Sequence, residues 1–252
     1  MKFRPCIDIH DGVVKQIVGS TLRDEKGDTP VTNFAASKPP QWYADLYRQD
    51  QLNGGHVIQL GKGNEAAAMA ALGAWPGGLQ LGGGVDIDNA ARWLDAGASA
   101  VIVTSWVFRN GFIDFERLKK LVAAIGAHRL VLDLSCRRKE DAYFIVTDRW
   151  QTYTREKVTR HLLEKLSRYC SEYLVHGVDV EGKCSGIEGP LVQLLGQWEG
   201  APITYAGGIR SLADIDRIKV LGGGHIDFTV GSALDLFGGS LLSYRMLADR
   251  YG

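Results

Sequence analysis

The feature that most constrains this 252-residue chain is a repeat at half its own length. Each half carries an aspartate in an apolar run, then a Gly-Gly pair, then a second short pair at a strand end. These landmarks are Asp8 and Asp133, Gly83-Gly84 and Gly207-Gly208, and Thr104-Ser105 and Gly231-Ser232. Corresponding residues lie 125, 124 and 127 positions apart. The sequence therefore predicts two similar halves, about 1–125 and 126–252, that bind two anionic groups and place a reaction between two carboxylates.

Short aliphatic runs alternate with longer segments of helical period, which indicates repeated β-α units and a parallel sheet. The eight strands expected are Phe3–Ile9, His56–Leu60, Leu79–Leu81, Ala100–Thr104, Leu130–Leu134, Tyr173–Val175, Ile203–Tyr205 and Ile226–Val230. Among eight expected helices, Ile113–Ile125 and Val158–Tyr169 show apolar residues at spacings of three and four. A doubly wound open sheet is the alternative architecture. Eight near-equal units with a half-length repeat favour a closed α/β fold, the (β/α)8 TIM barrel of about 250 residues.

Composition excludes several classes of protein. The 29 basic and 29 acidic residues cancel, so no overall field attracts nucleic acid or an anionic membrane. The opening MKFRPCIDIH lacks the apolar core of a signal peptide, and the longest apolar runs are strand-sized. No composition shift marks a second domain. We therefore expect one domain over residues 1–252, a cytoplasmic monomer that binds neither nucleic acid nor membrane.

The cysteines give no sign of a metal site. Cys6, Cys136, Cys170 and Cys184 form no C-x-x-C pair, and no histidine lies at zinc-ligand spacing from them. They are interpreted as reduced thiols that pack in the interior. The sequence therefore predicts no structural or catalytic metal.

Two connections are longer than the others, 12–40 after the first strand and 135–154 after the fifth. In a barrel, the loops after the strand C-termini build the active-site face, and long ones often serve as lids. Both long connections follow an aspartate, so we expect them to cover the site.

The aspartates themselves end the apolar runs PCIDI and LVLDL. Burying a carboxylate is costly, so a purely structural role would need a partner: Arg4 for one, and Arg137 or Arg138 for the other. Equivalent positions on opposite sides of an eight-stranded barrel favour function instead. We expect Asp8 and Asp133 to act as a general base and a general acid.

The Gly-Gly pairs each follow a strand and open a helix. Their backbone can approach an anion closely, and free N–H groups at the helix start complement its charge. Together with the strand ends they predict two phosphate sites, one of Gly83, Gly84, Thr104 and Ser105 and the other of Gly207, Gly208, Gly231 and Ser232. The second matches the recurring phosphate site after strands seven and eight of such barrels. The alternative is one phosphate site and one degenerate relic.

Two aromatic rings are further candidates at the mouth of the barrel. Trp150, in the connection after strand five, could stack on a flat heterocycle or cover the rim as an apolar contact. His176, at strand six, could carry protons or be a satisfied core histidine. Spacing alone leaves both alternatives open.

The chain resembles the eukaryotic-type branch of a histidine-biosynthesis isomerase family. That family converts the aminoaldose phosphoribosylformimino-aminoimidazole carboxamide ribotide (ProFAR) to the corresponding aminoketose (PRFAR). The resemblance runs from Cys6 to Gly239, through CIDIHDGVVKQIVGSTL, VIVTSWVF, LDLSCR, RWQT, HGVDVEGKCSGI, YAGG and GSALDLFGG. It implies a bisphosphorylated substrate and an Amadori rearrangement, with Asp8 as base and Asp133 as acid. It also implies that Trp150 covers the imidazole and that no cofactor or metal is needed.

One position departs from the resemblance. The widespread bacterial form has a threonine just before the acidic residue at the end of strand six, whereas here Val178 precedes Asp179. A valine side chain cannot form that hydrogen bond. Our hypothesis is that Asp179, His176 or Ser185 orients the substrate instead.

Three other functions stay open on the sequence alone. The cyclase of the same pathway, the cyclase subunit of imidazole glycerol phosphate synthase, shares the barrel, the half-repeat, both aspartates and the phosphate sites. Trp150 and the VGSAL ending of strand eight favour the isomerase over it. An FMN-dependent oxidoreductase barrel, and a catalytically inactive barrel that only binds phosphorylated ligands, are the remaining alternatives.

Overall fold

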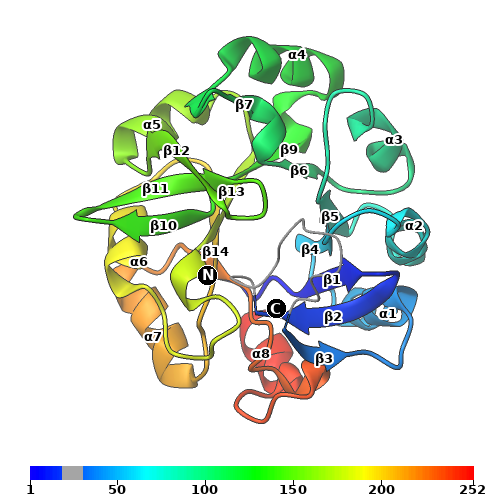
Figure 1. Ribbon diagram of the computed structural model, residues 1–252. Coiled ribbons are helices and arrows are strands. Elements are labelled where there is room, and N and C mark those ends of the chain that lie inside the picture. Colours follow the sequence, from blue (N-terminus) through cyan, green and yellow to red (C-terminus); the bar gives the residue numbers. More distant parts are fainter. Residues whose placement is uncertain (19–30) are drawn as a thin grey trace.

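The computed structural model describes residues 1–18 and 31–252. Ten of its strands form one curled sheet (Figure 1), in the order β15 (Asp227–Phe228), β14 (Ile203–Ala206), β13 (Glu172–His176), β9 (Leu130–Asp133), β6 (Val101–Val103), β5 (Leu79–Gly82), β4 (Gly55–Gln59), β1 (Cys6–His10), β2 (Val13–Ile17) and β3 (Thr32–Ala35). The pairings from β15 to β1 are parallel, and those of β2 with β1 and β3 are antiparallel. Each of the eight expected strands has a counterpart among the parallel ones.

The sheet closes on itself between its first and last parallel strands. Phe3 forms a parallel bridge with Phe228. Two backbone hydrogen bonds flank the bridge, Arg4 N to Phe228 O at 2.8 Å and Phe228 N to Lys2 O at 3.0 Å. β15 is thereby joined to the segment that leads into β1. The predicted closed barrel is confirmed, and the open doubly wound sheet is rejected.

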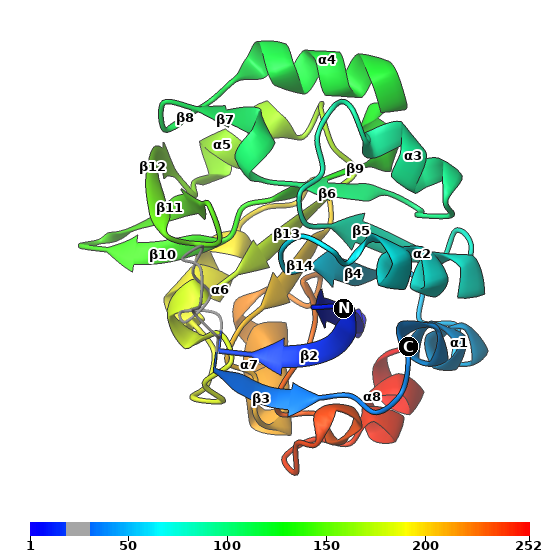
Figure 2. The same cartoon turned by 45° about the vertical axis from the view of Figure 1, so that its right-hand side comes forward.

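Helices surround the barrel (Figures 1 and 2). Within the described residues they are α1 (Pro40–Gln49), α2 (Glu65–Ala74), α3 (Ala90–Asp95), α4 (Phe115–Ile125), α5 (Arg160–Leu166), α6 (Gly189–Leu195), α7 (Leu212–Leu221) and α8 (Tyr244–Tyr251), with 3-10 turns η2 (Ser105–Val107), η3 (Ala127–Arg129), η4 (Val178–Val180) and η5 (Asp235–Phe237). None of the helices in the described ranges is long and apolar enough to cross a membrane.

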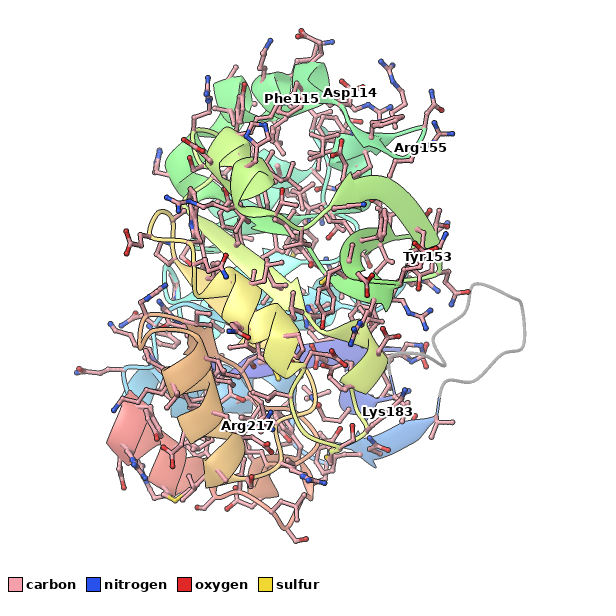
Figure 3. All side chains as sticks on the ribbon, turned by 90° about the vertical axis from the view of Figure 1, so that its left-hand side faces the viewer. Asp114, Phe115, Tyr153, Arg155, Lys183 and Arg217 are labelled. Carbon is pink, nitrogen blue, oxygen red and sulfur yellow. The ribbon has the colours of Figure 1, made fainter. Side chains whose placement is uncertain are left out.

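The start of α4 shows how local sequence fixes an element. The Asp114 side chain accepts hydrogen bonds from the N–H groups of Glu116 and Arg117, which caps the helix two residues later than the apolar period alone predicts. Figure 3 shows Asp114 and Phe115 at this end, on the same side of the molecule as Tyr153. The buried face of α4 keeps the predicted spacing.

Both long connections contain strands that the sequence did not suggest. The first contains β2 and β3, and residues 19–30 of this expected lid lie outside the described residues. The second forms a separate three-stranded sheet of β10 (Cys136–Lys139), β11 (Ala142–Thr147) and β12 (Thr152–Lys157), and a small hairpin of β7 (Phe108–Arg109) and β8 (Phe112–Ile113) lies near it (Figure 2). Antiparallel pairing gives these segments fixed partners.

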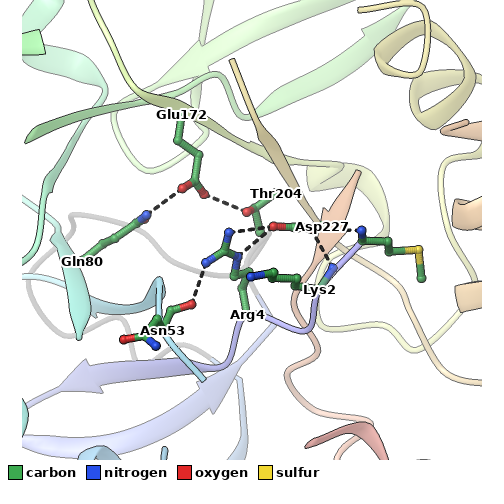
Figure 4. A network of polar contacts seen from close by, with 8 residues as sticks. Lys2, Arg4, Asn53, Gln80, Glu172, Thr204 and Asp227 are labelled. Carbon is green, nitrogen blue, oxygen red and sulfur yellow. Dashed lines mark hydrogen bonds and ion pairs between the residues drawn. The ribbon is translucent and has the colours of Figure 1, made fainter. Parts of the chain in front are cut away.

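A network of polar contacts closes the end of the barrel where the strands begin (Figure 4). Arg4 binds Asp227 through Nε at 2.8 Å and through a second nitrogen at 2.8 Å, and its remaining nitrogen donates to Asn53 O at 2.6 Å. Beside them, Glu172 accepts hydrogen bonds from Gln80 at 2.8 Å and from Thr204 at 2.7 Å. Both carboxylates are buried and hydrogen-bonded, which offsets the cost of removing them from water.

The Arg4–Asp227 pair gives the first prediction. Arg4→Ala leaves the buried Asp227 carboxylate with only the amino terminus of Met1, at 3.7 Å, as a charged partner, so the free energy of unfolding in urea should fall by about 3 kcal/mol. The control is Lys119→Ala, which removes an exposed pair with Glu116 and should cost less than about 1 kcal/mol. Equal losses in the two variants would show that the Arg4 pair contributes no more than a surface contact.

Candidate active site

Two cavities meet at the end of the barrel where the strands finish. The larger has a volume of about 750 Å³ and is lined by both predicted catalytic aspartates, Asp8 and Asp133. The smaller has a volume of about 40 Å³ and is also lined by Asp8. The residues common to both are Asp8, Gln16, His176 and Glu181. The site is therefore elongated, with Asp8 at its middle.

Asp8 lies on β1 and is held from the neighbouring strand. Gln16 on β2 donates a hydrogen bond from Nε2 to Asp8 Oδ2 at 3.0 Å. Burial, followed by the negative charge of Glu181, raises the pKa of Asp8 to about 6, although His176 and the Gln16 hydrogen bond oppose that shift. A Cβ at Gly231 would lie 2.3 Å from Gln16 Oε1, so glycine there leaves room for this arrangement. Asp8 is thus placed to exchange a proton near neutral pH.

Asp133 ends β9 and accepts hydrogen bonds from two residues. Thr104 Oγ1 donates to Oδ2 at 3.0 Å, the Ser135 N–H donates to Oδ1 at 2.7 Å, and the Ser135 hydroxyl also bonds Oδ1. Ser135 Oγ lies 3.0 Å from His176 Nδ1, and the His176 ring lies 5.3 Å from the Trp150 ring, centroid to centroid. A hydrogen-bonded chain therefore links Asp133 through Ser135 to His176.

A purely structural role for these aspartates would need arginine partners, but the candidate arginines bind other carboxylates. Arg4 binds Asp227 at the opposite end of the barrel. Arg137 Nε donates to Asp179 Oδ1 at 2.9 Å, and the Arg138 N–H donates to Asp179 Oδ2 at 3.1 Å. The structural alternative, in which Arg4 and Arg137 or Arg138 would pair with the two aspartates, is therefore not what the structure shows. Within the described residues, the hydrogen bonds to the two aspartates come from neutral groups.

The predicted phosphate residues divide between the two cavities. Gly83, Gly84, Thr104 and Ser105 line the larger one, and Gly207, Gly208, Gly231 and Ser232 line the smaller one. Ser105 Oγ accepts a hydrogen bond from Asp148 N, and Ser232 Oγ accepts one from Asn33, so both hydroxyl protons can still be donated to an anion. The Thr104 hydroxyl donates its proton to Asp133, and the place of Thr104 in the phosphate site stays a prediction.

The first glycine of each pair plays the same geometric role. Gly83 has a φ of +94°, and a Cβ there would lie 2.2 Å from Gln59 O. Gly207 has a φ of +117°, and a Cβ there would lie 2.8 Å from Gly177 O. Each glycine turns the chain against the end of the neighbouring strand, where a side chain does not fit. Bulkier residues at these positions would distort the fold and are poor probes of anion binding.

Of the three residues expected to orient the substrate, His176 lines both cavities. Asp179 lies in η4 and is held by Arg137 and Arg138, and neither Asp179 nor Ser185 lines either of these two cavities. The role expected for Asp179 and Ser185 stays a prediction, without a place for either residue in these two linings. The side chain of Trp150 lies beside His176, at the wall of the larger cavity.

Three residues of the site escaped the sequence reasoning: Gln16, Ser135 and Glu181. Each lies inside a quoted segment, in VVKQIV, LDLSCR and DVEGKC. Burial raises the pKa of Glu181, whose position in both cavities makes it a second carboxyl group beside Asp8. Their place in those segments was the one feature of the sequence that could have predicted these site residues. Spacing along the chain does not predict which residues meet across neighbouring strands.

Comparison with known proteins gives consistent results. A family model described as histidine biosynthesis protein matches residues 2–240. The chain is 55% identical over 246 residues, 96% of its length and 79% of the relative, to a Medicago truncatula protein named 1-(5-phosphoribosyl)-5-((5-phosphoribosylamino)methylideneamino) imidazole-4-carboxamide isomerase, chloroplastic. It is 49% identical to the isomerase of that name from Neurospora crassa, over 94% of this chain and 93% of the relative. The Saccharomyces cerevisiae relative of that name is 44% identical, over 96% and 95%.

The environment of Asp8 predicts a pH-dependent effect on stability. Its folded pKa of about 6 exceeds the ordinary 3.8, so the stability that its protonated form contributes is present below about pH 4 and is lost as the pH rises through about 6. Asp8→Asn cannot ionise. The difference in the free energy of unfolding in urea, variant minus parent, should be more positive at pH 8 than at pH 4, by at most about 3 kcal/mol.

The matched control for that measurement is Asp45→Asn, which changes a partly exposed carboxylate on α1 beside Arg48. Its effect on stability should stay within about 1 kcal/mol at both pH values. If the effect of Asp8→Asn did not change between pH 4 and pH 8, Asp8 would be ionising as it does in the unfolded chain.

Proposed function

This chain belongs to the histidine biosynthesis protein family, and on that premise we propose that it is the ProFAR isomerase, which converts a bisphosphorylated aminoaldose to the aminoketose. The relatives described above carry the isomerase name, which favours this activity over the cyclase, the flavin enzyme and the inactive barrel. The observation that carries the proposal is the pair of cavities that share Asp8, one of which also contains Asp133.

The shape of the site fits a substrate with two phosphorylated ends. One phosphate would lie by Gly84 and Ser105 in the larger cavity, and the other by Gly208 and Ser232 in the smaller one. The larger cavity also has room for the heterocycle beside Trp150. The sugar that reacts would then lie between the two ends, where Asp8 faces the shared part of the site.

The two aspartates divide the chemistry. Asp133 protonates the ribose ring oxygen, which breaks the bond between this oxygen and the anomeric carbon and leaves a protonated imine. Asp8 removes the proton from the adjacent sugar carbon, and the resulting neutral enolamine becomes the ketose when its hydroxyl loses a proton and the former anomeric carbon gains one. The pKa of about 6 makes Asp8 a stronger base than an ordinary aspartate while leaving it ionised at neutral pH.

Proton balance assigns a role to the groups between the aspartates. Over one turnover Asp133 gives up one proton, and the side of the site that contains Asp8 gains one. That proton has to return before the next turnover. Ser135 contacts both Asp133 and His176, and His176 lines both cavities, so these two residues provide the return path.

We further propose that residues 1–252 act as one domain built from two half-repeats, as a cytoplasmic monomer without a cofactor. Support for the monomer is that a single chain brings together both aspartates and both predicted phosphate sites. The word chloroplastic is part of the name of the Medicago truncatula relative and describes that protein.

Activity measurements on the aspartates test the mechanism. With the aminoaldose as the only substrate, Asp8→Asn and Asp133→Asn should each lower kcat by about 10²–10⁴-fold, the usual contribution of a general acid or base. Asp216→Asn, exposed on α7, is the control and should keep parental turnover. In buffer containing EDTA, kcat/KM should rise with pH through about 6, because Asp8 must be ionised to accept a proton. Full turnover in either active-site variant would reject the acid–base pair.

The two-ended binding of the substrate needs a separate test. An aspartate introduced at either end repels a phosphate, so Ser105→Asp and Ser232→Asp should each raise KM by about tenfold or more, which corresponds to about 1.4 kcal/mol. Ser240→Asp places the same charge on an exposed segment outside both cavities and should leave KM unchanged. An effect from only one of the two site variants would mean that one phosphate site is a relic.

A further inference from the structure

Three side chains in the smaller cavity have the chemistry of metal ligands. Cys6, Asp8 and His56 each offer one ligand atom, and these atoms all lie within 4.8 Å of one another. Cys6 and Asp8 alternate onto the same face of β1, and His56 on β4 pairs in register with Cys6. The parallel pairing of β1 and β4 thus brings together residues that are 50 positions apart in the chain.

A fourth polar group points to a ligand at the same place. Thr229 lines the same cavity and is only 6% exposed, yet its hydroxyl has no hydrogen-bond partner of normal geometry within the described residues. Burial raises the pKa of the Cys6 thiol, and the contact of this thiol with Thr229 opposes that rise. Buried hydroxyls without partners are rare in folded proteins, so this one calls for a bound species.

The donor set selects the kind of ion. A thiol, an imidazole and a carboxylate are the ligands that Zn²⁺ and similar thiophilic cations use, whereas Mg²⁺ and Ca²⁺ prefer oxygen alone. With Cys6 as thiolate and Asp8 as carboxylate, a divalent cation gives a neutral cluster, which limits the cost of burial. A volume of about 40 Å³ exceeds the roughly 30 Å³ share of one water, so the cavity has room for a small ion.

We propose that Cys6, Asp8 and His56 form a binding site for a divalent cation of the zinc type, with Thr229 or a water as the fourth ligand. The thiol proton of Cys6 is released to solvent when the metal binds. Ligand atoms in a tetrahedral zinc site lie about 3.5 Å apart, so the cluster closes by about 1 Å as the side chains rotate.

The site has a consequence for catalysis that rests on the proposed function. A bound cation takes up the Asp8 oxygen that would otherwise accept the substrate proton. The cation therefore inhibits the isomerase reversibly. Gln16, which donates to Asp8 and also lies 3.8 Å from Cys6 Sγ, holds two of the three ligands in place before the metal arrives.

Cobalt is the probe that reads out the site directly, because a Co²⁺–thiolate bond gives an intense charge-transfer band in the near ultraviolet. The protein of residues 1–252 is freed of metal with EDTA, dialysed and titrated with Co²⁺. The expected result is one Co²⁺ bound per chain, the thiolate band, and loss of that band when Zn²⁺ is added. Absence of the band, or its persistence in Cys6→Ser, would overturn the proposal.

Variants assign the ligands. His56→Gln should weaken Co²⁺ binding by about tenfold or more, since a missing ligand is poorly replaced, and it tests the site even if Cys6→Ser does not fold. Cys170→Ser changes a buried thiol that bonds Leu166 O outside both cavities, and should keep the band. Cys184 lines the same small cavity, so loss of the band in Cys184→Ser would assign the thiolate to that residue and overturn the proposal.

An activity measurement separates the site from the function. Zn²⁺ should abolish turnover of the aminoaldose, and excess EDTA should restore it. A cobalt band without inhibition would overturn the inhibitory role of the site. A cobalt band in a protein with no isomerase activity at all would leave the metal site standing and reject the proposed function.

Discussion

Closure of the sheet between Phe3 and Phe228 is the constraint on which the site depends. In the strand order, β1 and β15 are the two ends of the parallel run, and closure places them side by side. The smaller cavity needs that contact, because it combines Asp8 of β1 with Gly207 and Ser232, which follow β14 and β15. The larger cavity is lined from β4, β6 and β9 and from the loop after β5, and these strands follow β1 on its other side in the strand order. Asp8 belongs to both cavities only because the barrel is closed.

The sequence predicted the barrel well because its repeat reflects repeated geometry. Gly83 and Gly207 were found by their spacing. At each of them the backbone turns close to the end of the strand that comes before it in the sheet, β4 for Gly83 and β13 for Gly207. The predicted strand bounds failed where closure intervened: the first strand was expected from Phe3 but begins at Cys6, because Phe3 belongs to the closing bridge. Apolar patterns predict that a segment is extended, but they do not distinguish a regular strand from a single bridge.

The parts that could not be predicted are those fixed by contacts across the sheet. The connection after β1 was treated as a lid, and its β2 carries Gln16, whose amide reaches Asp8. Arg4, only four residues before Asp8, was offered as its partner but points to the opposite end of the barrel. The metal ligands were missed for the same reason, since zinc spacing rules search along the chain and His56 reaches Cys6 across it. Side-chain partners depend on register and closure, which local patterns do not contain.

Buried carboxylates have full sets of polar partners at one end of the barrel and incomplete sets at the other. Where the strands begin, two nitrogens of Arg4 bind Asp227 Oδ2, and Glu172 accepts two hydrogen bonds. Where they finish, Asp8 accepts one amide hydrogen bond, and burial, followed by the negative charge of Glu181, raises its pKa to about 6. A fully paired carboxylate would be a poor proton acceptor, so the reactive end cannot be satisfied in the same way. The incompletely paired Asp8 suits proton abstraction, and it also leaves an oxygen that a thiophilic cation can take. Reactivity toward the substrate proton and sensitivity to such a cation therefore have one physical origin.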